Sequence, residues 1–241
     1  MPRFFASRDP ADSAMALLDP GEMHHASAVL RMHPGESLTL IVDGALYASV
    51  FTGESRLPLG DPLPDTEPDI SVTLFQGIPK SDKLEWICQK ATECGADALV
   101  PVAMSRCVSR WDDRSAPKKT ERLSRIAQEA SKQSGRAVVP KVSLPISLKE
   151  MTALFPEFDL VLVPWEEARG VGPMRCWQSL QEKPKRVAIV IGPEGGIDPA
   201  EMEAMQKAGA QAITLGPRIF RTETAGIAAL CALMALSGNM G

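Results

Sequence analysis

The sequence of 241 residues lacks the features that mark metal-binding, secreted and membrane-spanning proteins. Its five cysteines include no Cys-x-x-Cys pair and its three histidines show no zinc-ligand spacing, so we expect no metal site. The first residues contain no apolar core of a signal peptide, which favours reduced thiols in a cytoplasmic protein. The longest apolar run, residues 225–236, is shorter than the roughly 20 residues that span a bilayer.

A basic surplus is missing as well. The formal net charge is −4, whereas nucleic-acid-binding proteins usually carry a basic surplus, so the total charge argues against such a function. The charges are unevenly distributed, however. Residues 1–68 hold four Lys/Arg and ten Asp/Glu, whereas residues 106–141 hold ten Lys/Arg and four Asp/Glu. The basic segment is either the solvated face of an amphipathic helix or a surface that contacts phosphates.

The chain divides near residue 68. Two strand-like runs within residues 37–50 flank Asp43-Gly44, a dipeptide that favours a tight hairpin turn. Residues 57–68 contain four prolines and resemble a linker or a long edge loop. We therefore predict a small β-rich domain over residues 1–68 and a second domain over residues 69–241.

The second domain alternates apolar runs with helices that carry start and stop signals. Several runs are apolar without alternation, as expected of parallel strands buried on both faces. Candidate capping boxes pair Asp82 with Glu85, Ser147 with Glu150 and Asp198 with Glu201. The predicted strands lie within residues 70–78, 98–102, 137–142, 159–163, 187–191 and 212–216. This pattern predicts an α/β fold with a parallel sheet.

A first candidate site is the sequence VAIVIGPEGGIDPAE at residues 187–201. A buried strand ends here in a glycine-rich loop, and a helix follows. Ligands of open α/β sheets bind outside the carboxyl ends of strands, where glycines permit close approach to the backbone. The loop matches neither a Walker motif nor G-x-G-x-x-G, and by itself could be only a tight turn.

A second candidate site is the sequence ITLGPRIFRTETAGIAAL at residues 213–230. A strand ends in Gly216-Pro217, two arginines follow, and Thr222 or Thr224 opens an apolar helix. Helix capping explains the threonines and Glu223, because an acidic residue in the first turn is favoured by the helix dipole. Capping leaves Arg218 and Arg221 unexplained.

Together, IGPEGG and LGPRIFRTETA resemble the paired signature of the SPOUT superfamily of ribosomal RNA methyltransferases. The sequence is most similar to the 16S rRNA N3-uridine methyltransferase family, known as RsmE. The resemblance extends through PRFF at the start, HHASAVLRMHPGESLTLIVDG, KSDKLEWICQKATECGADALVPV, SRCV and EASKQSGRAVVPKV. It covers nearly the whole chain.

The resemblance implies a PUA-like β-barrel that binds RNA over residues 1–68. It also implies a SPOUT methyltransferase domain with a carboxy-terminal trefoil knot over residues 69–241. The family binds S-adenosylmethionine in the knotted loops, largely through backbone groups. The implied cofactor-binding residues are Leu162, Val163, Pro164, Ile191, Gly192, Pro193, Glu194, Gly195, Gly196, Leu215, Gly216, Arg218, Ile219, Phe220, Thr222, Thr224 and Ala225.

The resemblance also implies roles in catalysis and in RNA binding. Arg221 matches the arginine of the family's R-T-E-T segment and is expected to favour the uracil anion. Glu223 either accepts the N3 proton or orients an arginine and caps the helix. Contacts with RNA or support of the site are expected from Arg3, Arg31, Arg106, Gln133 and Arg136, for each of which a purely structural role stays open.

The expected activity is methylation of N3 of a uridine in 16S rRNA, free or in the assembled small subunit, by a homodimer. The apolar helix at residues 225–236 must be buried, either between two copies or within one. Two alternatives remain: methylation of another rRNA or tRNA nucleotide, and a noncatalytic RNA-binding dimer.

Overall fold

The computed structural model describes residues 1–240, which form two compact units. The first unit contains residues 1–67 together with residues 131–138. The second contains residues 68–130 and 139–240. In the part of the chain that is described, no helix combines the length and apolarity needed to cross a membrane.

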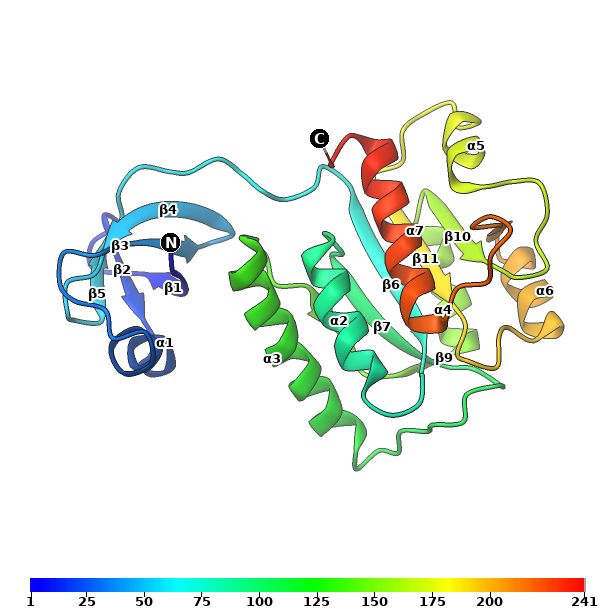
Figure 1. Cartoon of the computed structure of the whole chain (residues 1–241), viewed down its shortest axis with the longest axis horizontal. Coiled ribbons are helices and arrows are strands. Elements are labelled where there is room, and N and C mark those ends of the chain that lie inside the picture. Colours follow the sequence, from blue (N-terminus) through cyan, green and yellow to red (C-terminus); the bar gives the residue numbers. More distant parts are fainter. Residues whose placement is uncertain (241) are drawn as a thin grey trace. The chain divides into compact units, whose positions relative to one another are not determined.

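The first unit is built on a five-stranded sheet with the order β4-β3-β1-β2-β5. Its strands are β1 (Arg3–Arg8), β2 (Met15–Leu18), β3 (Ser37–Val42), β4 (Ala45–Val50) and β5 (Arg56–Pro58), shown in blue to cyan in Figure 1. β1 runs parallel to β3, and the other neighbours are antiparallel. Helix α1 (Pro20–His24) continues into a π-helical turn (His25–Val29).

The turn between β3 and β4 has the predicted form. Asp43 and Gly44 adopt φ angles of 54° and 75°, the left-handed values that a two-residue hairpin of this type requires. The proline-rich segment that follows β5 is partly ordered by the same hairpin. The backbone N–H groups of Gly60 and Leu63 donate to carbonyls of β4, at 2.9 and 2.8 Å.

Residues 131–138 complete the first unit, which the sequence did not indicate. Ala137 packs in a buried cluster with Ile41 and Leu46. Arg136 is only 5% exposed, and its guanidinium contacts the carboxylate of Glu67 at 2.6 Å. The predicted domain of residues 1–68 is therefore a discontinuous unit, because its core and its ion pairs need this later segment.

The second unit contains a seven-stranded, entirely parallel sheet. The main order is β12-β10-β11-β6-β7-β8, and β9 also pairs with β7. The strands are β6 (Ser71–Gly77), β7 (Ala98–Ala103), β8 (Lys141–Val142), β9 (Ile146–Ser147), β10 (Leu160–Pro164), β11 (Arg186–Ile191) and β12 (Gln211–Ile213). The α/β prediction is confirmed, although residues 137–142 supply only the two-residue strand β8.

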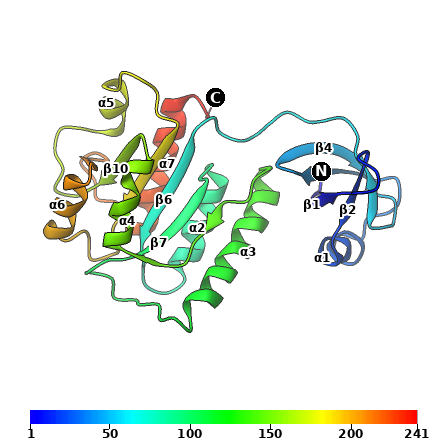
Figure 2. The same cartoon turned by 180° about the vertical axis from the view of Figure 1, so that it is seen from behind.

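Helices cover both faces of this sheet. One face carries α2 (Lys83–Glu93), α5 (Pro173–Gln178), α7 (Thr222–Ser237) and the first part of α3 (Ala116–Ser134). The other carries α4 (Leu148–Leu154) and α6 (Pro199–Lys207), which lie nearer the viewer in Figure 2. Successive strand residues point to opposite faces, so Val187 and Ile189 pack in one core and Ala188 and Val190 in the other. This two-sided burial explains the unbroken apolar runs.

The three candidate capping boxes have different outcomes. The box of Ser147 and Glu150 is complete, with both reciprocal hydrogen bonds formed. Asp198 caps α6 through the N–H of Ala200, while Glu201 instead accepts from the backbone N–H of Ser105. The side chain of Asp82 makes no capping hydrogen bond, so that prediction is wrong.

We predict that Arg136→Met strongly destabilises the first unit. The substitution leaves the Glu67 carboxylate largely buried without its guanidinium partner, which costs about 3–5 kcal/mol when such a pair is broken from one side. The free energy of unfolding in urea measures the effect. Arg125→Met is the control, because its pair with Glu121 is exposed and contributes less than about 1 kcal/mol. Equal small losses in both variants would contradict the assignment.

Candidate active site

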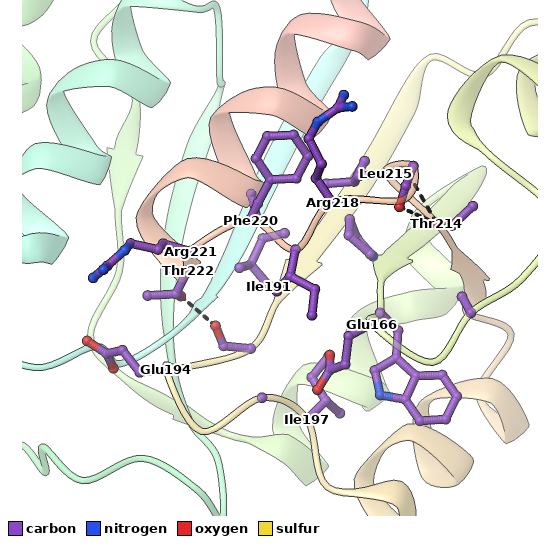
Figure 3. Close-up of a pocket in the computed structure, with 18 of the residues that line it drawn as sticks. Glu166, Ile191, Glu194, Ile197, Thr214, Leu215, Arg218, Phe220, Arg221 and Thr222 are labelled. Carbon is purple, nitrogen blue, oxygen red and sulfur yellow. Dashed lines mark hydrogen bonds between the residues drawn. The ribbon is translucent and has the colours of Figure 1, made fainter.

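The loops that follow β10, β11 and β12 meet around one pocket of about 1020 Å³. Because all three strands are parallel and neighbouring, their carboxyl ends open at the same edge of the sheet. The start of α7 closes part of the same pocket. Figure 3 shows Arg221 and Glu194 at one side of it, and Glu166 and Ile197 at another.

Most of the residues predicted for the site line this pocket. They are Pro164, Ile191, Gly192, Pro193, Glu194, Gly195, Gly196, Leu215, Gly216, Arg218, Ile219, Phe220, Arg221, Thr222, Glu223 and Ala225. Three predicted cofactor-binding residues do not. Leu162 and Val163 are buried within β10, with side chains in the two cores, and Thr224 is exposed outside the pocket lining. On this side the pocket is lined by Pro164, the last residue of β10, and by the loop that follows it.

The glycines of the loop after β11 are required by close contacts. A Cβ on Gly192 would lie 2.7 Å from the side chain of Ile197. Gly196 has φ of 72°, a left-handed backbone conformation that residues with a side chain rarely adopt. At these two glycines the loop lines the pocket with backbone alone.

A buried polar junction joins this loop to α7. The Thr222 hydroxyl donates to the carbonyl of Gly192 at 2.6 Å, drawn as a dashed line in Figure 3. The amide Nε2 of Gln76, a fully buried residue of β6, donates to the same hydroxyl at 2.9 Å. Thr222 is thus both a pocket residue and a fixed connection between the two predicted motifs.

A charged junction lies beside it. The Lys83 ammonium contacts Glu194 at 3.0 Å and Glu223 at 3.2 Å. Hydrogen bonds to Glu194 and then to Glu223 raise the pKa of Lys83. The pKa of Glu223 is lowered by its own backbone N–H, by Lys83 and by the charge of Arg221. The pKa of Glu194 is lowered despite its partial burial, through its own backbone N–H and Lys83. All three groups are therefore charged at neutral pH.

Several lining residues were not found from the sequence. They include Lys83, Trp165, Glu166, Arg169 and Thr214. Trp165, Glu166 and Arg169 follow β10 directly, so the signal was their position after a buried strand. Lys83 follows β6, and its place at the pocket depends on the pairing of β6 with β11, which the sequence does not specify.

The residues expected to contact RNA are found in different settings. Arg106 donates to the carbonyl of Gly195 at 3.2 Å and pairs with Asp198, so it supports the glycine loop. Arg3 donates to the carbonyls of Lys132 and Gln133 at the end of α3.

The other three expected residues also differ from one another. Arg136 is buried in its pair with Glu67, the structural arrangement that the sequence left open for it. Gln133 and Arg31 are exposed, and Arg31 has φ of 54°. Gln133, Arg31 and the partly paired Arg106 are the exposed members of the five, as the RNA-contact interpretation requires.

The pocket and fold define a class of protein. A family model described as an RNA methyltransferase domain matches residues 66–234, which include the whole parallel sheet and every pocket residue. The carboxyl-end loops that form the pocket thus lie within the region that characterises RNA methyltransferases.

Sequence similarity to named relatives identifies one family within the class of RNA methyltransferases. Ribosomal RNA small subunit methyltransferase E of Bacillus subtilis is 37% identical over 221 residues, covering 88% of this chain and 86% of the relative. The protein of that name from Mycobacterium bovis is 34% identical over 254 residues, covering 98% and 92%. The chain belongs to the ribosomal RNA small subunit methyltransferase E family.

A solved structure supports the same relationship. The ribosomal RNA small subunit methyltransferase E from Neisseria gonorrhoeae, bound to S-adenosyl methionine, is 30% identical with a TM-score of 0.84. The alignment covers 98% of both chains. A putative methyltransferase from Legionella pneumophila, in complex with the same cofactor, is 28% identical with a TM-score of 0.82 over 98% and 97% of the chains.

We predict that Thr222→Val destabilises the protein by about 1–3 kcal/mol, because the buried Gln76 amide and the Gly192 carbonyl each lose a partner. Valine keeps the shape of threonine, so packing changes little. Thr224→Val is the control, since this threonine is exposed in the same helical turn. Urea unfolding of both variants measures the difference, and equal stabilities would refute the junction's contribution.

Proposed function

We propose that this protein methylates N3 of a uridine in the RNA of the small ribosomal subunit, with S-adenosylmethionine as methyl donor. The observation that carries the proposal is the pocket at the carboxyl ends of β10, β11 and β12, in a chain whose relatives are named for this class of reaction. The choice of uridine N3 rests on the resemblance of IGPEGG and LGPRIFRTETA to that family. A cytoplasmic location follows from the proposed substrate.

The pocket suits a nucleoside with an amino-acid tail. Its volume of about 1020 Å³ lies at the upper end of small-molecule sites. Gly192 and Gly196 line the pocket without side chains, and Glu166 adds a carboxylate able to accept from hydroxyl or ammonium groups. We assign cofactor binding to the loops over residues 191–197 and 214–220 and to Pro164. When bound, S-adenosylmethionine supplies a methyl group on a positively charged sulfur.

Arg221 is assigned to the substrate. The N3–H of uracil is weakly acidic, and a nearby cation favours the anion that forms when this proton leaves. Arg221 lies at the pocket and is exposed at its edge, where a base from outside can reach it. Glu223 is assigned to orienting Lys83 and Arg221, because a carboxylate with a lowered pKa is a weak proton acceptor.

RNA binding is assigned to both units. The first unit, as a PUA-like barrel, would contribute the exposed Arg31 and Gln133. The second would contribute exposed cations of residues 106–130, among them Arg110, Arg114 and Lys118. Because the protein is acidic overall, the footprint on RNA is expected to be local.

A knotted chain and a homodimer complete the proposal. The loops after β10 and β12 are tied by a backbone hydrogen bond from Thr214 to Val171 at 2.9 Å, and α7 then packs against β11 and β6, consistent with a trefoil knot. The half-exposed apolar side of α7, with Ile227, Ala228 and Cys231, is the proposed contact between two copies.

We predict that Arg221→Ala lowers the turnover of methyl transfer by about 100-fold or more, the usual effect of losing a group that stabilises developing charge. Affinity for S-adenosylmethionine should stay within about threefold of the unmodified protein, because Arg221 acts on uracil in this assignment. Calorimetry and single-turnover kinetics measure the two quantities separately. A matched loss of cofactor affinity would instead place Arg221 in the cofactor site.

A strain that lacks this gene should contain 16S rRNA without the N3-methyluridine that its parent carries. Mass spectrometry of nuclease digests detects the modified nucleoside, and the gene restored on a plasmid is the control. Persistence of N3-methyluridine, together with loss of another methylated nucleotide in rRNA or tRNA, would favour the first alternative. Failure of the purified protein to bind S-adenosylmethionine would favour a noncatalytic RNA-binding protein.

A further inference from the structure

Lys83 occupies a distinctive position at the pocket. It lies in the first turn of α2, after β6, and its ammonium contacts one carboxylate from each of the two glycine-containing motifs. Glu194 belongs to the loop after β11, and Glu223 belongs to the first turn of α7. One cation from a third element therefore connects two pocket walls that are separate in sequence.

The loop that carries Glu194 depends on side chains for its position. Its contacts include the Thr222 hydroxyl on Gly192 and Arg106 on Gly195. At Glu194 itself, the backbone N–H of Lys80 donates to both carboxylate oxygens, at 3.1 and 3.3 Å. Lys83 adds the charged contact that extends onward to α7. Loss of its charge would leave two carboxylates facing each other across the pocket edge.

From this arrangement we infer that Lys83 is a positioning residue for the cofactor site: it fixes the loop of residues 192–196 against the start of α7 before any ligand binds. The inference rests on the proposed function for the identity of the ligand. A loop that is already held in its binding conformation loses less entropy when the ligand binds. Lys83 would therefore raise the affinity for the cofactor. Lys83 needs no contact with the ligand to act in this way.

The chain offers a matched control on the same helix. Lys90 pairs with Glu93, and its side chain is 32% exposed against 31% for Lys83. The Lys90 pair lies within α2 and joins no pocket elements. Lys83→Met and Lys90→Met therefore remove equally exposed ammonium groups, of which only one connects the two loops. Lys83→Arg tests whether another cation restores the connection.

Two readouts test the inference. Calorimetry with S-adenosylmethionine should show about tenfold weaker binding for Lys83→Met, near-normal binding for Lys83→Arg and unchanged binding for Lys90→Met. Hydrogen exchange of the ligand-free proteins should be faster over residues 192–196 and 221–225 in Lys83→Met alone. Melting temperatures should stay close together, because each ion pair is partly exposed.

The outcomes separate this inference from the proposed function. Binding by Lys83→Met equal to that of the unmodified protein, with unchanged exchange of the two segments, would overturn the inference alone. A large fall in melting temperature in Lys83→Met would also overturn it, since the residue would then act on the whole fold. If the unmodified protein binds no S-adenosylmethionine, the proposed function fails, and the exchange measurement still decides whether Lys83 holds the loop.

Discussion

The hydroxyl of Thr222 connects the parts of the pocket. It accepts a hydrogen bond from the buried Gln76 amide and donates one to the carbonyl of Gly192, so that a strand, a loop and a helix meet at one atom. This bond holds the start of α7 directly against the glycine loop, beside the ion pairs that Lys83 makes with Glu194 and Glu223. The placement of Arg221 and Glu223, which flank Thr222 in the chain, follows from the same bond.

The parallel sheet makes this junction possible. Because β6 pairs with β11 along six residues, Gln76 lies opposite Ile191, directly before the glycine loop. Side chains of β11 pack alternately into two cores, which fixes the strand and therefore the point where the loop begins. Apolar packing therefore fixes the strands that carry the pocket loops. Polar contacts of Thr222, Arg106 and Lys83 then fix the positions of the loops themselves.

The sequence predicted the parts of the structure that depend on local patterns. The apolar runs identified the strands, Asp43-Gly44 identified the hairpin, and Ser147 with Glu150 identified a complete capping box. It could not predict partners that are distant in sequence. Glu201 fits a capping box equally well, yet its carboxylate binds the backbone of Ser105, because α6 and the loop after β7 are brought together only by the fold.

The partners of basic residues could not be predicted from the sequence either. Residues 106–141 form one basic segment in the sequence, but in the folded protein their basic side chains have different partners. Arg106 supports the glycine loop, and Lys132 and Arg136 form ion pairs inside the first unit with Glu22 and Glu67. A cation already paired with a buried carboxylate releases no counterion from a phosphate. The number of phosphates bound should therefore be smaller than the count of basic residues suggests, and the dependence of RNA affinity on salt correspondingly shallow.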